Sequence, residues 1–369
     1  MRTLFFLLFI LQFTHILAQT NPQQKDTIQQ KTERLKEVIV SANTILGSKF
    51  EIKNKTGSAN YISEEDLKKF SYTNINRVLQ TVPGINIYEE DGFGLRPNIS
   101  LRGTSPERSA KINLMEDGVL IAPAPYSAPA AYYFPTIGRM QAIEVLKGSS
   151  QIQYGPNTTG GAINMISSRI PDKFSGRASI AAGNYGSRNT QLVIGDTYKN
   201  FGFVTDYFNY NSDGFKNIDG GGNTGFDKSD YLAKFRVNTN LDAKTYQSLT
   251  FKIQYSEEEA NETYLGLTDE DFEENPYRRY RASSEDVMNA EHQQYQLTHF
   301  IQVSPSLNIS TTGYLNKFKR NWYKLTDVNL GERMSINNIL SSPQDYPLEY
   351  QTILGNENTQ DDVMGIKAN

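Results

Sequence analysis

The residues best suited to chemistry lie in a charged stretch between positions 256 and 291. It holds twelve carboxylates and three arginines, and the arginines occur in the run Tyr277-Arg278-Arg279-Tyr280-Arg281. Guanidinium groups among tyrosines favour recognition of planar carboxylates, because their N–H groups form a fork that matches the two carboxylate oxygens. The acidic residues have no regular metal-ligand spacing, so we expect a solvated loop rather than a metal site. A loop this long is usually functional or disordered.

Other catalytic chemistry is poorly supplied. The chain has no cysteine, and its histidines are His15, His292 and His299. A Cys nucleophile, a Ser-His-Asp triad and a His-rich metal site are therefore disfavoured. A secreted enzyme on a β-scaffold, with a carboxylate pair as in glycosidases, is a distant alternative. The net charge of −4 and the lack of any basic run also exclude a typical nucleic-acid binder. We predict no enzyme activity, no catalytic residues, no resident metal and no cofactor.

Alternating strands from about residue 171 must position the charged loop. In the clearest example, the apolar residues 249, 251, 253 and 255 alternate with the polar residues 250, 252, 254 and 256, and similar runs give seven or eight strands. Lys, Arg and Gln on one face with aromatics on the other fit a transmembrane barrel, whose lumen is polar. A soluble sandwich alternates too, with its apolar face inward. The 22 Tyr and 19 Phe residues, together with the N-terminal signal, favour the barrel.

The chain begins with a targeting signal. Arg2 precedes the apolar run 4–11, and Ala18 precedes Gln19, which predicts a secretory signal peptide over 1–18. A membrane anchor is the alternative, but eight apolar residues are too few to span a bilayer. A polar linker over 19–49 follows, and it contains the β-prone run 37–42, which either adds to a partner's sheet or packs on its own domain.

The segment 50–170 is expected to form a compact α+β domain. Helices are predicted to start at Ser63, where Asp66 completes a capping box, and over 74–80. Short strands are predicted over 85–88, 98–102, 111–115, 143–147 and 162–166, with a hairpin turn at Asp117-Gly118. The proline-rich stretch 122–135 is predicted to be a stiff loop.

This domain resembles the plug domain of TonB-dependent outer-membrane receptors. The resemblance is carried by six blocks in order: Val82-Pro83-Gly84-Ile85, Ser100-Leu101-Arg102-Gly103, Asp117-Gly118-Val119, Ile143-Glu144-Val145-Leu146-Lys147-Gly148, Tyr154-Gly155-Pro156 and Gly160-Gly161-Ala162-Ile163-Asn164. It implies an α+β plug over 50–170, followed over 171–369 by the first part of an antiparallel transmembrane β-barrel in the outer membrane. Such transporters use 22 strands, so we expect the sequence to be part of a longer receptor.

Within this family, the chain is most similar to the ferric-citrate receptor type. The similarity rests on Arg102-Gly103 with Pro106 and Arg108, on Ala124-Pro125-Tyr126 with Pro129, and on the loop segment 262–268. It implies import of a ferric chelate, either ferric citrate or a similar siderophore. Another siderophore, haem or cobalamin is the alternative ligand. About eighteen residues separate the expected cleavage site from Glu37, too few for an extra signalling domain.

The resemblance also implies the site residues. The expected ligand contacts lie on apical plug loops and on the charged barrel loop: Arg96, Arg108, Tyr126, Ser127, Arg278, Arg279 and Arg281. For each plug arginine, a salt bridge to the barrel wall is an equally good interpretation, and Arg102 is expected to be structural, in a strand facing the barrel interior. The TonB box, which would pair with the periplasmic TonB protein, is Glu37, Val38, Ile39, Val40, Ser41 and Ala42.

Overall fold

The computed structural model describes residues 58–70, 73–121, 133–147, 154–155, 159–240, 243–304, 306–355 and 363–368. The chain divides into two compact units, 1–38 and 39–369. The first unit lies wholly outside the described residues, as do the predicted signal peptide and the run 37–42. Every described helix and strand therefore belongs to the second unit.

A small mixed sheet organises the first part of this unit. Its strands run in the order β1-β6-β7-β4-β5, with β4 and β7 parallel and the other neighbours antiparallel. The bounds are β1 Ser58–Ile62, β4 Ile112–Glu116, β5 Val119–Leu120, β6 Met140–Lys147 and β7 Gly161–Ser167. A separate hairpin pairs β2, Ile85–Tyr88, with β3, Asn98–Leu101. Buried aliphatic residues from these strands form one core with the helices.

The helices of this domain begin where their caps predict. The helix α3, Glu64–Phe70, has a reciprocal capping box, in which the Asp66 N–H donates to Ser63 Oγ at 3.3 Å and the Ser63 N–H donates to Asp66 Oδ2 at 3.1 Å. The helix α4, Ile75–Leu79, is capped by Asn74. Two single turns of 3₁₀ helix, η2 and η4, cover Glu107–Ser109 and Ile137–Arg139.

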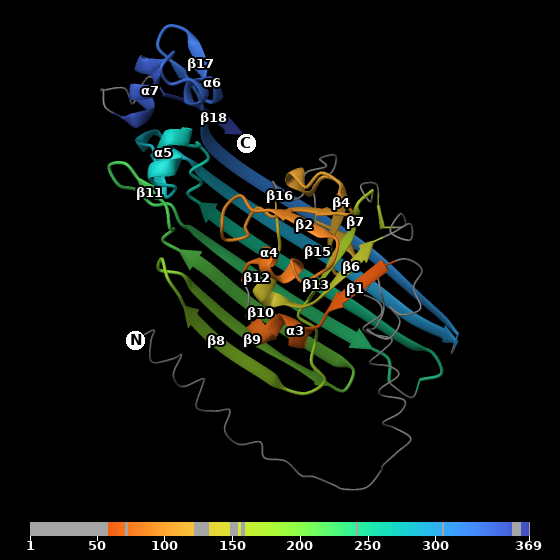
Figure 1. Ribbon diagram of the computed structural model, residues 1–369. Coiled ribbons are helices and arrows are strands. Elements are labelled where there is room, and N and C mark those ends of the chain that lie inside the picture. Colours follow the sequence, from red (N-terminus) through yellow and green to blue (C-terminus); the bar gives the residue numbers. More distant parts are fainter. Residues whose placement is uncertain are drawn as a thin grey trace, which may run out of the picture. The chain divides into compact units, whose positions relative to one another are not determined.

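A large antiparallel sheet forms the second part of the unit. Its strands follow the order β17-β16-β15-β13-β12-β10-β9-β8, and β18 also pairs with β16. The bounds are β8 Ser175–Ala182, β9 Arg188–Tyr198, β10 Phe201–Ser212, β12 Phe226–Asn238, β13 Tyr246–Ala260, β15 Val287–Ser304, β16 Leu307–Asn329, β17 Arg333–Ser335 and β18 Val363–Ala368. The seven long strands match those that alternation predicts. Figure 1 shows the small domain lying against one face of this sheet.

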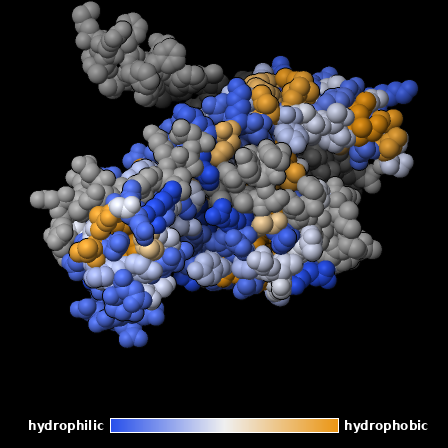
Figure 2. All heavy atoms as spheres, turned by 90° about the horizontal axis from the view of Figure 1, so that it is seen from above, coloured by the Kyte–Doolittle hydropathy of each residue, from blue (hydrophilic) through white to orange (hydrophobic). Residues whose placement is uncertain are grey.

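The two faces of the large sheet differ as the alternation predicts. Lys234, Lys252 and Gln254 are buried on the face that carries the small domain. Phe235 and Phe251 on the other face are about two-fifths exposed. The polar face is thus covered by protein, and the aromatic face is left open, as expected of strands that would contact lipid. Figure 2 shows extensive hydrophilic surface together with separate hydrophobic patches.

The longest connections between strands all lie at one end of the sheet. Only two residues separate β9 from β10, and only two separate β15 from β16. The opposite end carries the loops 213–225, 261–286 and 330–362, whose elements are β11 Asn217–Ile218, α5 Asp269–Glu274, β14 Arg278–Arg279, η6 Arg281–Glu285, α6 Ile336–Ser341 and α7 Pro347–Leu354. Figure 1 shows α5, α6 and α7 beyond these strand ends. In outer-membrane barrels the long loops lie on the outer side, so the resemblance noted above implies that this end faces outward.

Two expectations need correction. Arg102 does not lie in a strand: β3 ends at Leu101, and Arg102 is an exposed turn residue with φ of 57°. The Arg102 N–H donates to the carbonyl of Gly84 at the open end of the hairpin, and the positive φ of Arg102 and Gly103 then turns the chain out of the strand. The charged loop is also shorter than 256–291, because β13 continues to Ala260 and β15 begins at Val287. Among the described residues, no helix is long and apolar enough to cross a membrane.

Candidate functional site

The plug is fixed to the sheet by a buried network of charges. Asp117-Gly118 forms the predicted hairpin turn after β4, with φ of 50° and 79°, and places Glu116 and Asp117 against the wall. Arg139, at the end of η4, binds both Glu116 oxygens at 2.7 and 2.9 Å and Asp230 of β12 at 3.2 Å. The side chain of Arg139 is completely buried. The bidentate geometry is the strongest form of an ion pair between arginine and a carboxylate.

Two wall lysines complete this network. Lys252 lies 2.6 Å from Glu116 and 2.7 Å from Asp117, and Lys234 lies 3.1 Å from Asp117. Burial alone would raise the pKa of Asp117, but Lys234 and Lys252 outweigh it and hold that pKa far below its usual range. Three cations and three carboxylates are therefore buried together with no net charge. Such a neutral cluster fixes the plug, since separating any partner would leave a buried charge unpaired.

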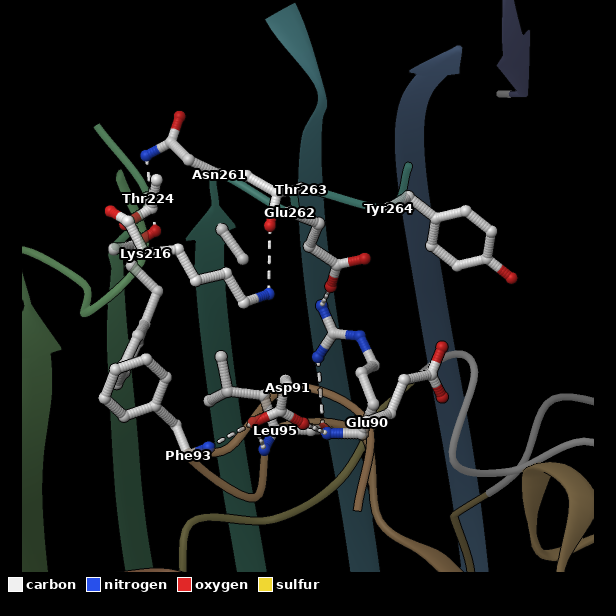
Figure 3. A pocket seen from close by; sticks show the side chains of 14 residues that line it. Glu90, Asp91, Phe93, Leu95, Lys216, Thr224, Asn261, Glu262, Thr263 and Tyr264 are labelled. Atoms are coloured by element: carbon white, nitrogen blue, oxygen red, sulfur yellow. Dashed lines mark hydrogen bonds and ion pairs between the residues drawn. The ribbon is translucent and has the colours of Figure 1, made fainter. Parts of the chain in front are cut away.

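A pocket opens at the long-loop end of the sheet, between the plug loop 89–97 and the ends of β12 and β13. Its volume is about 180 Å³. The lining residues come from the plug, from the loop 213–225 and from the start of the loop 261–286: Glu90, Asp91, Phe93, Leu95, Arg96, Lys216, Thr224, Gly225, Phe226, Ala260, Asn261, Glu262, Thr263 and Tyr264. Figure 3 shows Lys216 reaching from one wall toward Thr263, with Glu90, Glu262 and Tyr264 on the other side. The small domain and the sheet wall therefore both contribute to this pocket.

Asp91 shapes the plug side of this pocket. Its carboxylate accepts the backbone N–H groups of Phe93, Gly94, Leu95 and Arg96, at 2.6 to 3.1 Å. These four bonds wrap the loop around one side chain. These bonds hold the loop in one conformation. They also use the acceptor sites of the Asp91 carboxylate for backbone N–H groups of the same loop.

Arg96 lines the pocket but is already paired. It forms ion pairs with Glu258 of β13 and with Glu262, the latter at 3.0 Å. Burial acts to lower the pKa of Arg96, yet the two glutamates raise it well above its ordinary value. Burial raises the pKa of Glu262. The salt bridge to the wall is the arrangement in this structure, and direct ligand contact by Arg96 stays a prediction.

The predicted loop arginines have different surroundings. Arg278 forms ion pairs with Asp219 at 2.9 Å and with Asp271 at 2.6 Å. Asp271 also accepts hydrogen bonds at 2.5 Å from the hydroxyls of Tyr280 and Tyr350, which joins the loop 261–286 to α7. Burial alone would raise the pKa of Asp271, but these hydrogen bonds and Arg278 lower it. Arg278 thus supports the outer loops, with its charge neutralised.

Arg279 and Arg281 form no ion pair with any carboxylate in the described part of the chain. Arg279 Nη1 donates to the carbonyls of Pro276 and Arg278, at 3.0 and 2.5 Å. Arg281 is exposed, and its side chain packs closely against Gly220 and Gly355. A Cβ at Gly220 would lie 2.3 Å from Arg281 Nη1, and one at Gly355 would lie 2.3 Å from Arg281 Cδ.

The predicted plug contacts are only partly described. Arg108, an exposed residue of η2 with φ of 50°, lies on the plug surface. Tyr126 and Ser127 lie outside the described residues. The structure thus brings Arg96 to the pocket lining, whereas Arg108 and Arg278 to Arg281 do not line it.

Sequence reasoning missed Lys216, Glu90 and Glu262 as pocket residues. The segment Asp213 to Gly225 contains five glycines, which could have marked it as a shaped loop, but nothing in it identified Lys216. No group of three or more His, Asp or Glu that could hold a metal occurs in the described ranges. The pocket is lined by hydrogen-bonding and charged side chains.

Comparison with known proteins agrees with this architecture. A family model for the TonB-dependent receptor plug domain matches residues 51–162. The structure is similar to the ferric citrate transporter FecA, at 21% identity and a TM-score of 0.62, over 75% of this chain and 42% of that one. It is also similar to the ferric yersiniabactin uptake receptor FyuA from Yersinia pestis, at 18% identity and a TM-score of 0.61, over 73% and 42%.

A third similar structure is the ferric-catecholate import receptor Fiu from E. coli K12, at 15% identity and a TM-score of 0.55, over 74% of this chain and 40% of that one. This chain therefore spans about two-fifths of the length of these proteins. The three are a transporter, an uptake receptor and an import receptor. Residues 51–162 thus match the TonB-dependent receptor plug domain, and the chain shares the fold of the plug and adjoining strands of these solved receptors.

Proposed function

We propose that the protein acts in TonB-dependent import of a ferric chelate, ferric citrate or a similar siderophore, across the outer membrane. The observation that carries the proposal is the pocket at the long-loop end, built jointly by the plug and the sheet wall. A chelate bound there touches both the part that blocks the pore and the part that surrounds it. Binding can therefore bias the position of the plug, because a ligand shifts an equilibrium only through contacts that differ between its states.

The charges around the pocket support an oxygen-rich ligand. Lys216 lines it, and Arg279 and Arg281 lie in the adjoining loop without a carboxylate partner among the described residues. Cationic N–H donors hold the carboxylate oxygens of a ferric chelate by charge-assisted hydrogen bonds. Tyr264 adds an aromatic surface at the rim.

Energy for release must come from a partner, since the outer membrane holds no nucleotide supply. We propose that the run Glu37 to Ala42 adds as a strand to the periplasmic TonB protein, the mode by which an extended peptide joins another sheet. The buried charge network around Arg139 holds the plug in place until TonB pulls on the bound segment. Transport of haem, cobalamin or another siderophore uses the same steps, so only ligand binding separates these alternatives.

Uptake of radiolabelled ligand tests the proposal, with the label on iron in the ferric chelates and haem and on cobalt in cobalamin. Cells that depend on this receptor for iron are given ferric citrate, a ferric hydroxamate, haem or cobalamin, with and without a functional TonB protein. We expect TonB-dependent uptake of ferric citrate or of another ferric chelate. Uptake of haem or cobalamin alone would assign the receptor to that ligand, and uptake that does not need TonB would contradict the proposal.

A further inference from the structure

One cation in the pocket has no carboxylate partner among the residues that the structure describes. The Lys216 ammonium donates a hydrogen bond to Thr263 Oγ1 at 2.9 Å, and no described carboxylate lies within 4 Å of it, the limit that defines an ion pair. An ammonium group has three donors, so Lys216 keeps donors available. Figure 3 shows this side chain extended across the pocket.

The acids that line the same pocket are, in contrast, already engaged. Asp91 accepts four backbone N–H groups, and Glu262 is paired with Arg96. Glu90 accepts a hydrogen bond from Asn98 Nδ2 at 2.9 Å. Of the two cations that line the pocket, Arg96 is paired with Glu258 and Glu262, whereas Lys216 keeps donors that no described carboxylate takes up. These ammonium donors suit an anionic oxygen.

The backbone that carries Lys216 is held in place on both sides. The Thr224 hydroxyl donates to the Lys216 carbonyl at 2.9 Å, and the Asn217 N–H donates to the Tyr277 carbonyl at 2.8 Å. The preceding ring, Phe215, packs against Phe93 with centroids 5.4 Å apart. A side chain on a fixed backbone is positioned before the ligand arrives, which reduces the entropy lost on binding.

The surroundings also make an unpaired ammonium at this position unfavourable. Burial lowers the pKa of Lys216, and the nearby charge of Arg279 lowers it further, against the opposing effect of Asp91, Glu262 and Glu90. Arg279 bonds only to carbonyl oxygens in the described part of the chain. A bound anion would remove this penalty, because it pairs with the ammonium and offsets the second cation.

We infer that Lys216 is the residue of this pocket that binds a carboxylate of the ligand, with Thr263 as its positioning partner and Arg279 as the source of additional positive potential. This inference rests on the proposed import of a ferric chelate and specifies how the chelate is held. Arg96 then serves to support the plug loop, since its guanidinium is paired with Glu258 and Glu262.

The first test is the chemical reactivity of Lys216 in the receptor purified in detergent. An amine-reactive acetylating reagent is applied at mildly alkaline pH, and modification is mapped by mass spectrometry. Lys173, an exposed lysine outside the pocket, is the internal control. We expect citrate to protect Lys216 and not Lys173. Equal modification with and without citrate, or protection by inorganic phosphate but not by citrate, would overturn the carboxylate assignment.

The second test measures affinity through Trp322, the single tryptophan, whose ring lies 5.3 Å from that of Tyr264 at the pocket rim. Quenching by ferric citrate is titrated in Lys216→Met, Lys216→Arg and the control Lys173→Met. We expect Lys216→Met to weaken binding at least tenfold, Lys216→Arg to retain most of it, and Lys173→Met to match the parent protein.

The two tests separate this inference from the proposed function. Uptake of ferric citrate with unchanged affinity in Lys216→Met would refute the role of Lys216 and leave the transport proposal standing. Protection of Lys216 by citrate in a protein that imports no iron would establish the anion site and refute transport. Thr263→Val provides a further check, since loss of its hydroxyl should weaken protection without abolishing it.

Discussion

Replacing Arg139 by methionine should loosen the plug from the sheet wall. Methionine keeps much of the side-chain volume but removes the bidentate bond to Glu116, the bond to Asp230 and a bond to the Tyr133 hydroxyl at 3.0 Å. Glu116 would keep Lys252 as a partner. Asp230 would keep the Thr136 N–H but lose its one ion-pair partner among the described residues.

The expected size follows from that uncompensated charge. Removing one partner of a buried ion pair is destabilising by about 3–5 kcal/mol. At about 1.4 kcal/mol per tenfold change, this corresponds to a roughly hundredfold to several-thousandfold rise in the population of opened plug. Arg139→Lys should recover only part of the loss, because an ammonium cannot form the planar fork.

Hydrogen–deuterium exchange of β4 and β6 measures this opening in the receptor purified in detergent. Both strands lie in the plug core, so their amides exchange only when that region opens. The control is Arg169→Met, which removes an exposed arginine 3.9 Å from Glu64 and should change the opening free energy by at most about 1 kcal/mol. If Arg139→Met changes exchange in β4 and β6 no more than the control does, the charge network does not hold the plug.

Three further outcomes are expected. Asp286 is buried, which raises its pKa from 3.8 to about 7, so the folded protein keeps a proton there that the unfolded chain releases. Stability should therefore fall as the pH rises from about 4 to about 7, and Asp286→Asn should remove that fall in melting curves. Gly138→Ala should destabilise the protein by about 1–3 kcal/mol in thermal or denaturant unfolding. The reason is that its Cβ would lie 1.9 Å from the Phe208 ring, and a stability equal to that of the parent would contradict this packing. Deleting 37–42 should abolish iron uptake and leave ligand binding intact, so normal uptake would refute its role in coupling.

Much of the plug could be predicted from the sequence because its signals are local. The capping box at Ser63 and the Asp117-Gly118 turn each depend on residues within a few positions of one another. Strand register and face depend on the two-residue repeat, so the buried positions of Lys234 and Lys252 agree with the alternation. The predicted ends of β3 and β13 were wrong, because a strand ends where its hydrogen-bond partners on the neighbouring strand end.

The site was harder to predict, because its chemistry depends on pairing across the fold. Arg96 and Arg278 resemble free ligand-binding arginines in the sequence, but the fold brings Glu258 and Asp219 to them from distant segments. Nothing in the sequence around Lys216 marks it as a ligand-binding residue. Whether its ammonium is free to bind a ligand depends on how far the folded chain keeps carboxylates from it.

The alternating strands, the plug motifs, the absence of cysteine and the scarcity of histidine can be read from the chain alone, since each is a property of composition or of neighbouring residues. Which charges neutralise one another depends instead on the folded arrangement. Ion pairing falls off over a few ångströms, and residues 116, 139, 230 and 252 come within that range only when plug and sheet pack together. The same packing leaves Lys216 as the cation in the pocket without a described carboxylate partner, and no spacing along the chain could have shown it.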